Sequence, residues 1–447
     1  MSGIMGIDFD KSCWGDVTDA VSVLQPRGDE WGGFAALQNG KIKREADRGK
    51  IKPLLDREGP KLSDPKTAIF HVNQSPNNPQ PAWIEDSPMG PIALAFDGKI
   101  TNKKELRRQS PYLVGSEAGI VARLVAAGSN PVEGLNNVYQ NVKGPFSLVL
   151  LTLNGIFAAR DLMGIRPMVL SRFFSSDRGG CAVASESACL EHVGMDLIRD
   201  VRPGEIISVE ANGFKTIKQF PEANLKICSF EYGYWARPSS IIEGVWVGEA
   251  RVNAGKKLSG AIPQADIVSS FPMSGNASAE GLHQATGIKY QSIFDYNAEP
   301  GGRSFLPFSS ELRARRAKNK LLIMPWAIKG RKIIIVDDSV VEGNQTLSRI
   351  SAIKRVGAVE IHLRIETPPI KYPCPFDVTP RGSLLAANHT VEEMRKILRV
   401  DTLSFNTVDD FVDAIISAQD GKRKAEEPIK RANICLGCFT GEFPEYI

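Results

Sequence analysis

Two consecutive carboxylates, Asp337 and Asp338, stand where a run of four apolar residues ends. That run, residues 333–336 (IIIV), has the β-branched composition of a strand buried in a parallel sheet, and open sheets of this kind bind ligands beyond the carboxyl ends of their strands. The carboxylates can accept hydrogen bonds from neighbouring hydroxyls of a sugar. The polar run 339–346 can surround a phosphate, with Gly343 allowing close backbone approach. On these residues alone, two Asp that simply cap a strand-to-helix turn are an equal alternative.

A second candidate for chemistry is Ser2, because removal of Met1 is expected when a small residue follows it. A terminal residue with a nucleophilic side chain and a free α-amine can use that amine as its own general base. The start of the chain therefore leaves open a serine-dependent amidase.

Composition describes an ordinary globular protein of two or three domains, with 447 residues, 42% of them hydrophobic and 24% charged. The net charge of +4 is small for this length, so it argues neither for nucleic acid nor for a membrane surface as partner. No apolar run has the length of a membrane span, and the start lacks a basic segment followed by an apolar one. Seven cysteines, an odd number, favour a reducing compartment, and we expect a cytoplasmic protein.

Several stretches predict the elements that must position these residues. Clustered apolar residues at 144–161 and 181–187 predict strands of a layered sheet. An aromatic-rich strand is expected after residue 225, ending in a turn at 237–240, and another strand at 264–275 ends in a Gly-containing loop. The stretch 303–320 is strongly basic, which is most often a solvated helix face. An amphipathic helix is expected after residue 380, and 420–428 is a charged linker.

The sequence IIIVDDSVVEGNQT, which begins at residue 333, resembles the signature VDDSIVRGTT of the glutamine PRPP amidotransferases. These are type I phosphoribosyltransferases that bind 5-phosphoribosyl-1-pyrophosphate (PRPP). The first half resembles their glutaminase domain: SGIMGI is similar to CGIVGI, LQPRGDEWGG to LQHRGQDSAG, HVNQS to HVRYS, and LAFDGKITN to LAHNGNLTN. The resemblance implies an α/β and α+β protein, an N-terminal-nucleophile αββα sandwich followed by a type I phosphoribosyltransferase parallel-sheet domain. We expect these domains at 2–235 and 236–420, with a tail at 421–447.

Four departures change residues on which the family's glutamine chemistry depends. The catalytic Cys is Ser2 here, and a hydroxyl is a poorer nucleophile than a thiol at neutral pH. The Arg that grips the glutamine carboxylate is Asn73. The Asn of the oxyanion hole is Asp97, whose charge would repel a developing oxyanion, although Gly98 is kept. The Asp that holds the substrate ammonium is displaced or replaced by Glu117. We expect a glutaminase-shaped domain kept for its interfaces rather than a working glutaminase.

In the second half, the resemblance implies a PRPP site with altered edges. Glu342 stands where the family has Arg, and Met273 replaces an Asp of the pyrophosphate loop. The basic run matches a mobile flap that closes over PRPP and excludes water, an alternative to the solvated face. Mg²⁺ is expected to accompany PRPP. The residues implied in binding PRPP or a nucleotide are Ser274, Arg303, Lys318, Lys320, Asp337, Asp338, Ser339, Gly343, Asn344, Gln345 and Thr346.

The pair Cys435 and Cys438 forms CLGC, a spacing used by redox, zinc and iron–sulfur sites alike. Together with Cys228 and Cys374, the pair matches the ligands of a [4Fe–4S] cluster in one subgroup of the family. Four thiolates can also hold zinc, which would be the favoured interpretation without the resemblance. Either metal would fasten the tail across both domains and contribute to folding. The other cysteines match no ligand position.

The family reaction displaces pyrophosphate from PRPP with ammonia taken from glutamine, giving 5-phosphoribosylamine at the entry to purine synthesis. For this chain we expect the PRPP half of that reaction, with free ammonia or another amine as nucleophile. The alternative is a catalytically silent relative that binds a nucleotide or a partner protein, with the cluster as a structural or redox element. We expect a homo-oligomer.

Overall fold

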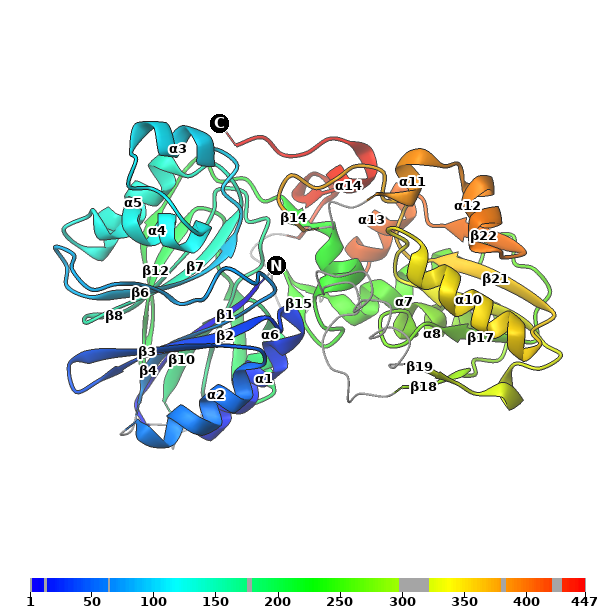
Figure 1. Cartoon of the computed structure of the whole chain (residues 1–447), viewed down its shortest axis with the longest axis horizontal. Coiled ribbons are helices and arrows are strands. Elements are labelled where there is room, and N and C mark those ends of the chain that lie inside the picture. The colour runs from blue at the N-terminus through cyan, green and yellow to red at the C-terminus, as the bar shows by residue number, and fades with distance from the viewer. Residues whose placement is uncertain are drawn as a thin grey trace.

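The computed structural model describes residues 2–11, 14–62, 65–174, 179–296, 321–378, 383–419 and 428–446. Within these ranges the chain forms two halves side by side, one mainly blue to cyan and the other green to orange in Figure 1. The red C-terminal tail runs from the second half back toward the first. None of the helices in these ranges is long and apolar enough to cross a membrane.

Two antiparallel sheets form the first half. A seven-stranded sheet has the order β11-β9-β10-β1-β4-β2-β3, and a six-stranded sheet has the order β13-β12-β8-β7-β6-β5. Their strands are β1 (Ser2–Phe9), β2 (Trp31–Gln38), β3 (Lys41–Arg48), β4 (Thr67–Asn73), β5 (Ala82–Ile84), β6 (Ile92–Gly98), β7 (Phe146–Thr152), β8 (Gly155–Arg160), β9 (Val169–Arg172), β10 (Gly180–Ala184), β11 (Asp196–Asp200), β12 (Glu205–Glu210) and β13 (Gly213–Gln219).

Helices cover the outer face of each sheet. Strand β1 shows how the sequence builds these layers, because its apolar residues alternate between two cores: Ile4 packs between the sheets, whereas Met5 and Ile7 pack toward the helices. The predicted αββα sandwich is confirmed. The helices on the seven-stranded sheet are α1 (Trp14–Leu24), α2 (Ile51–Glu58) and α6 (Ser187–Glu191), and those on the six-stranded sheet are α3 (Lys103–Gln109), α4 (Glu117–Ala126) and α5 (Pro131–Asn141).

A four-stranded parallel sheet with the order β17-β20-β21-β22 forms the second half. Helices pack on both faces, so β20 is buried on both sides, which is why residues 333–336 form an uninterrupted apolar run. The predicted parallel sheet is confirmed. Its elements are β17 (Ile267–Ser270), β20 (Lys332–Asp337), β21 (Glu360–Ile365), β22 (Thr402–Phe405), α7 (Val247–Lys257), α8 (Asn276–Thr286), α10 (Asn344–Val356), α11 (Leu385–Asn388), α12 (Val391–Leu398) and α13 (Val408–Ile416).

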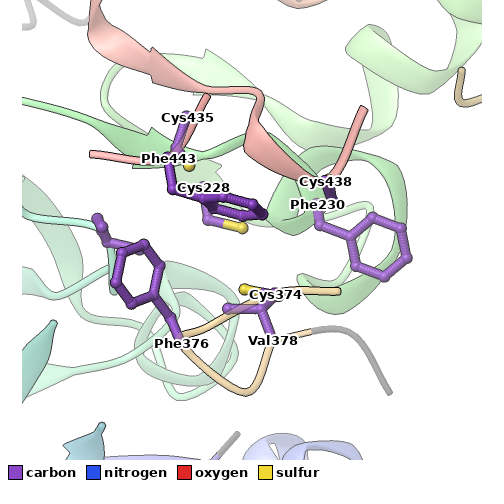
Figure 2. Close-up of a pocket in the computed structure, with 9 residues that line it drawn as sticks. Cys228, Phe230, Cys374, Phe376, Val378, Cys435, Cys438 and Phe443 are labelled. Atoms are coloured by element: carbon purple, nitrogen blue, oxygen red, sulfur yellow. The ribbon is translucent and has the colours of Figure 1, made fainter. Parts of the chain in front are cut away.

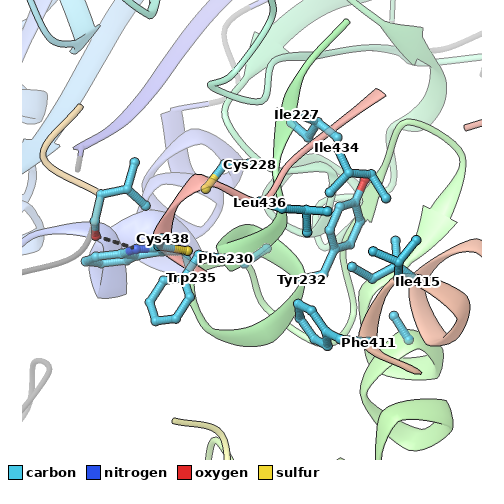
Figure 3. Packing of buried hydrophobic residues seen from close by; sticks show 14 of the residues in the cluster. Ile227, Cys228, Phe230, Tyr232, Trp235, Phe411, Ile415, Ile434, Leu436 and Cys438 are labelled. Atoms are coloured by element: carbon cyan, nitrogen blue, oxygen red, sulfur yellow. Dashed lines mark hydrogen bonds between the residues drawn. The ribbon is translucent and has the colours of Figure 1, made fainter. Parts of the chain in front are cut away.

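A separate apolar core joins the halves and the tail (Figure 3). Trp235 donates its indole N–H to the carbonyl of Val378 at 3.0 Å, and Phe411 packs edge-on against Phe439. Strand β14 (Ile227–Cys228) pairs in parallel with β23 (Ile434–Cys435) of the tail. The aromatic-rich strand expected after residue 225 is wrong beyond β14, because Glu231–Trp235 forms a π-helical turn, η3, whose aromatic rings fill this core. The remaining strands and α-helix are β15 (Ile241–Ile242), β16 (Val245–Trp246), β18 (Phe294–Tyr296), β19 (Leu321–Ile323) and α14 (Gly437–Thr440), and short 3-10 helices lie at η1 (Gln25–Arg27), η2 (Gly59–Lys61), η4 (Pro325–Ala327) and η5 (Arg431–Asn433).

Candidate functional site

The tip of β20 presents two buried carboxylates. Asp337 ends the strand and Asp338 follows it, and these two residues are only 5% and 4% exposed. The backbone N–H of Asp338 donates to Asp337 Oδ1 at 3.1 Å, and the Ser339 hydroxyl donates to Asp338 Oδ2 at 2.6 Å. The residues after β21, Glu366 and Thr367, donate their backbone N–H groups to the carbonyls of the two Asp. These contacts fix both carboxylates at the carboxyl edge of the sheet.

Burial, reinforced by the charge of Asp338, raises the pKa of Asp337 well above its usual range, and Arg349 offsets this only in part. Burial also raises the pKa of Glu366, a third carboxyl at this edge, which accepts a hydrogen bond from the Ser278 hydroxyl. Glu366 was not predicted from the sequence, although it occupies directly after β21 the position that Asp338 occupies directly after β20.

The polar run after the two Asp wraps into the start of α10. Gly343 has φ +80, and a Cβ there would lie 2.9 Å from a methyl of Leu385, so both conformation and space require glycine. Thr346 is buried, whereas Asn344 is exposed and donates its amide to Glu342 Oε2 at 3.4 Å. Glu342 thus places a negative charge at a helix N-terminus, where the backbone favours an anion. It competes with a phosphate for that position.

The loop after β17 lies at the same edge of the sheet. The backbone N–H of Phe271 donates to the Val336 carbonyl at 2.9 Å, and a Cβ on Gly275 would lie 2.5 Å from that oxygen. Ser274 therefore sits on a loop packed against the end of β20, whereas Met273 is 62% exposed. The flap residues of the sequence analysis lie outside the described residues: Arg303, Lys318 and Lys320.

In the first half, Ser2 and Asp97 meet across the two sheets. The backbone nitrogen of Ser2, at the start of β1, donates to Asp97 Oδ1 at 2.9 Å, and Asp97 is 1% exposed. Gly98 allows a close approach, because a Cβ there would lie 2.5 Å from the Pro145 carbonyl. Nearby on β4, burial lowers the pKa of His71 to about 3, although the Asp97 charge acts in the opposite sense. This histidine is neutral at physiological pH and is not a cationic partner for a substrate.

The Asn73 amide is used inside the protein. Its nitrogen donates to the Asn78 carbonyl at 2.5 Å and its oxygen accepts from the Ser75 backbone N–H at 3.0 Å, so it closes the turn after β4. Glu117 is likewise paired, since its Oε1 lies 3.0 Å from Lys99 Nζ.

A fully buried ion network that no sequence pattern predicts lies beside Gly3 of β1. Arg27 Nε lies 2.5 Å from Glu186 Oε1, and Arg27 Nη2 lies 2.7 Å from Glu231 Oε2. Burial alone would lower the pKa of Arg27, but these carboxylates raise it above its usual value. Because Glu231 belongs to the junction turn η3, the network ties that turn to the first half.

Four thiols line one small cavity between the halves and the tail (Figure 2). Cys228 and Cys435 are paired in the β14-β23 register, Cys374 lies on the loop before Val378, and Cys438 is on α14. Burial raises the pKa of Cys435 to about 11, and burial together with the neighbouring thiols raises that of Cys228. Within the described ranges, no group of three or more His, Cys, Asp or Glu side chains is arranged to bind one metal ion.

Comparisons with known proteins agree with this architecture. The family model "Glutamine amidotransferase domain" matches residues 67–192. The amidophosphoribosyltransferase of Bacillus subtilis is 30% identical over 440 residues, covering 95% of this chain and 90% of that protein. The same enzyme of Methanothermobacter thermautotrophicus is 31% identical, covering 99% and 94%. The solved glutamine PRPP amidotransferase of B. subtilis, complexed with ADP and GMP, superposes with a TM-score of 0.87 at 29% identity, covering 99% and 97%.

The similarity spans both halves and the tail, so it covers the β20 tip, the Ser2 region and the thiol cavity together. The chain belongs to the amidophosphoribosyltransferase family.

Proposed function

We propose that this protein transfers the phosphoribosyl group of PRPP to free ammonia or another amine and does not use glutamine. The observation that carries the proposal is the pair Asp337 and Asp338, buried at the tip of β20 beside the β17 loop. In the reaction, the C1–O bond to pyrophosphate breaks, the nitrogen lone pair forms the C1–N bond, and the amine loses a proton. Mg²⁺, which prefers oxygen ligands and substrate phosphates, would accompany the pyrophosphate.

The carboxyl pair suits a ribose because two buried carboxyl groups on neighbouring residues can each form a hydrogen bond with one of two adjacent sugar hydroxyls. Asp337, with its raised pKa, can donate a hydrogen bond, while Asp338 accepts one from Ser339 and has further acceptor capacity. The pair can therefore accept a hydrogen bond from one sugar hydroxyl and donate one to its neighbour. The phosphate would sit at the start of α10, and there Glu342 opposes it. We therefore expect weaker PRPP binding than an arginine at that position would give.

The glutamine half faces three physical obstacles. The nucleophile would be the hydroxyl of Ser2, which a nearby base must deprotonate. After removal of Met1, the base that Ser2 itself carries is its α-amine. Asp97, whose Oδ1 lies 2.9 Å from that nitrogen, favours the protonated ammonium form of the amine. The same Asp97 would repel an oxyanion rather than donate to it. The Asn73 amide, already bonded within its turn, supplies no charge for a substrate carboxylate.

We further propose that Cys228, Cys374, Cys435 and Cys438 hold a [4Fe–4S] cluster. The four thiols surround one common cavity, and their match to the cluster ligands of one subgroup of the family supports iron–sulfur rather than zinc. Bound there, the cluster would supply a cross-link between tail and junction. Because thiolates are the ligands and the thiol pKa values are raised, loading releases protons and strengthens with pH.

A second candidate function is a silent relative that binds a nucleotide, as the B. subtilis neighbour binds ADP and GMP. Glu342 at the start of α10 and the exposed Met273 favour it, since both weaken pyrophosphate and phosphate contacts.

Pyrophosphate release from Mg–PRPP distinguishes these candidates. The proposal predicts release with an ammonium salt at alkaline pH and no release above background with glutamine. Equal rates with glutamine would contradict the account of Ser2 and Asp97. If neither ammonium nor glutamine supports pyrophosphate release, and ADP or GMP stabilises the protein thermally, the result would support the nucleotide-binding relative instead.

A further inference from the structure

One lysine bridges the two halves beside the Ser2 region. Lys99 Nζ lies 3.0 Å from Glu117 Oε1 and 2.6 Å from Asp377 Oδ2. Lys99 follows β6 two residues after Asp97, Glu117 begins α4, and Asp377 lies three residues after Cys374 in the other half. The bridge therefore joins the surroundings of Ser2 to the wall of the thiol cavity.

Lys99 carries its positive charge at neutral pH. Burial alone would lower the pKa of Lys99, but the hydrogen bond to Asp377 and the charge of Glu117 raise it above its ordinary value. One ammonium thus contacts two carboxylates, and both contacts would be lost if Lys99 moved away.

The loop 374–378 is held at successive residues by the first half. Arg166 Nη2 donates to the Phe376 carbonyl at 2.8 Å, and Lys99 binds the next residue, Asp377. Asp377 has φ +55, a left-handed conformation that is unfavourable for most non-glycine residues, so contacts around it hold it in place. The Phe376 side chain lines the thiol cavity with Cys374 (Figure 2). The position of Cys374 therefore depends on groups of the first half.

We infer that Lys99 is a positioning residue that latches the Cys374 loop onto the Ser2-bearing half and couples the thiol cavity to the N-terminus of α4. With the latch closed, the cavity wall is fixed and Glu117 is neutralised from within the chain. If the cavity wall shifts, Lys99 loses Asp377 and is held by Glu117 alone. This mechanical link does not depend on the proposed function.

Thiol alkylation tests whether losing the Lys99 contact in the first half loosens the Cys374 loop in the second half. The variants are Lys99→Met, which keeps the aliphatic stem, and Asp377→Asn, which keeps the shape and tolerates a positive φ. Lys103→Met is the matched control, because Lys103 feels the Glu117 charge but lies outside the bridge. In metal-free protein, we expect iodoacetamide to label Cys374 about tenfold faster in both latch variants than in wild type or control, as local opening becomes easier.

Cys181, buried in the core between the sheets, is the internal reference for global unfolding. Unchanged labelling of Cys374 in both latch variants would overturn the inference. So would a parallel rise at Cys181, because the effect would then be general destabilisation.

Hydrogen exchange tests the opposite direction. The Gly119 amide donates to the Ser116 hydroxyl at 3.1 Å and caps α4 next to Glu117. Asp377→Asn changes only the second half, yet the latch predicts about fivefold faster exchange of this amide, since Lys99 would be held by Glu117 alone. Exchange equal to wild type, in a variant whose Cys374 loop has loosened, would refute coupling between the two sites.

Discussion

His71 makes the stability of the first half sensitive to mild acid. It is 1% exposed on β4, and burial lowers its pKa to about 3, against 6.5 for the free side chain. Below pH 6.5 the unfolded chain therefore binds a proton that the folded chain does not, so stability falls as the pH drops. The loss continues until the pH reaches the folded pKa. Linkage gives a loss of about 2 kcal/mol between about pH 7.5 and about pH 5 from this residue alone.

Urea unfolding at both pH values tests this magnitude. His71→Gln cannot titrate, so its loss of unfolding free energy over this interval should be about 2 kcal/mol smaller than that of wild type. His389→Gln, at an exposed position, is the control and should behave as wild type. Buried carboxyls with raised pKa values, such as Asp161, act in the opposite direction but are common to all three proteins. Equal losses in wild type and His71→Gln would refute the reasoning.

Three further predictions concern the contacts between the halves and the tail. Arg27→Met leaves two buried carboxylates without their cation and should destabilise the protein by about 3–5 kcal/mol in urea unfolding; a loss below about 1 kcal/mol would contradict the network. Tyr446→Phe removes the hydrogen bond that the tail donates to buried Asp161 at 2.7 Å, and should cost about 1–2 kcal/mol, whereas Tyr112→Phe, at an 82% exposed position, should cost nearly nothing. Stripping iron from anaerobically prepared protein should speed proteolysis within 428–446, and protein that carries no iron would contradict the proposed cluster.

The sequence predicts those parts of the structure that depend on local pattern. The apolar run 333–336 is a strand buried on both faces, and the layered sheets follow from alternation such as that of Ile4 and Met5. The turn η3 was mispredicted as a strand because aromatic residues are compatible with both a strand and a helical turn. The packing of the core around Trp235 determines that the turn forms. The expected domain limits stay a prediction.

Contacts across long sequence separations escape such reasoning. Ser2 and Asp97 are 95 residues apart, and only the resemblance to a family placed both in one region. Arg27 and Glu231 are 204 residues apart, so their spacing in the sequence does not predict an ion pair. Such partners are brought together by the packing of whole layers of the fold. Lys99 was missed for the same reason, since its second partner lies in the other half.

Calorimetry with Mg–PRPP tests the central claim most directly, by comparing wild type with Asp337→Asn/Asp338→Asn and with Asp409→Asn, whose side chain is 80% exposed on α13. The account predicts a binding heat for wild type and for Asp409→Asn, and an affinity at least about 100-fold lower for the double variant, because two hydrogen bonds involving carboxyls are lost. No heat with wild type, or equal affinity in the double variant, would contradict a sugar-phosphate site at the tip of β20.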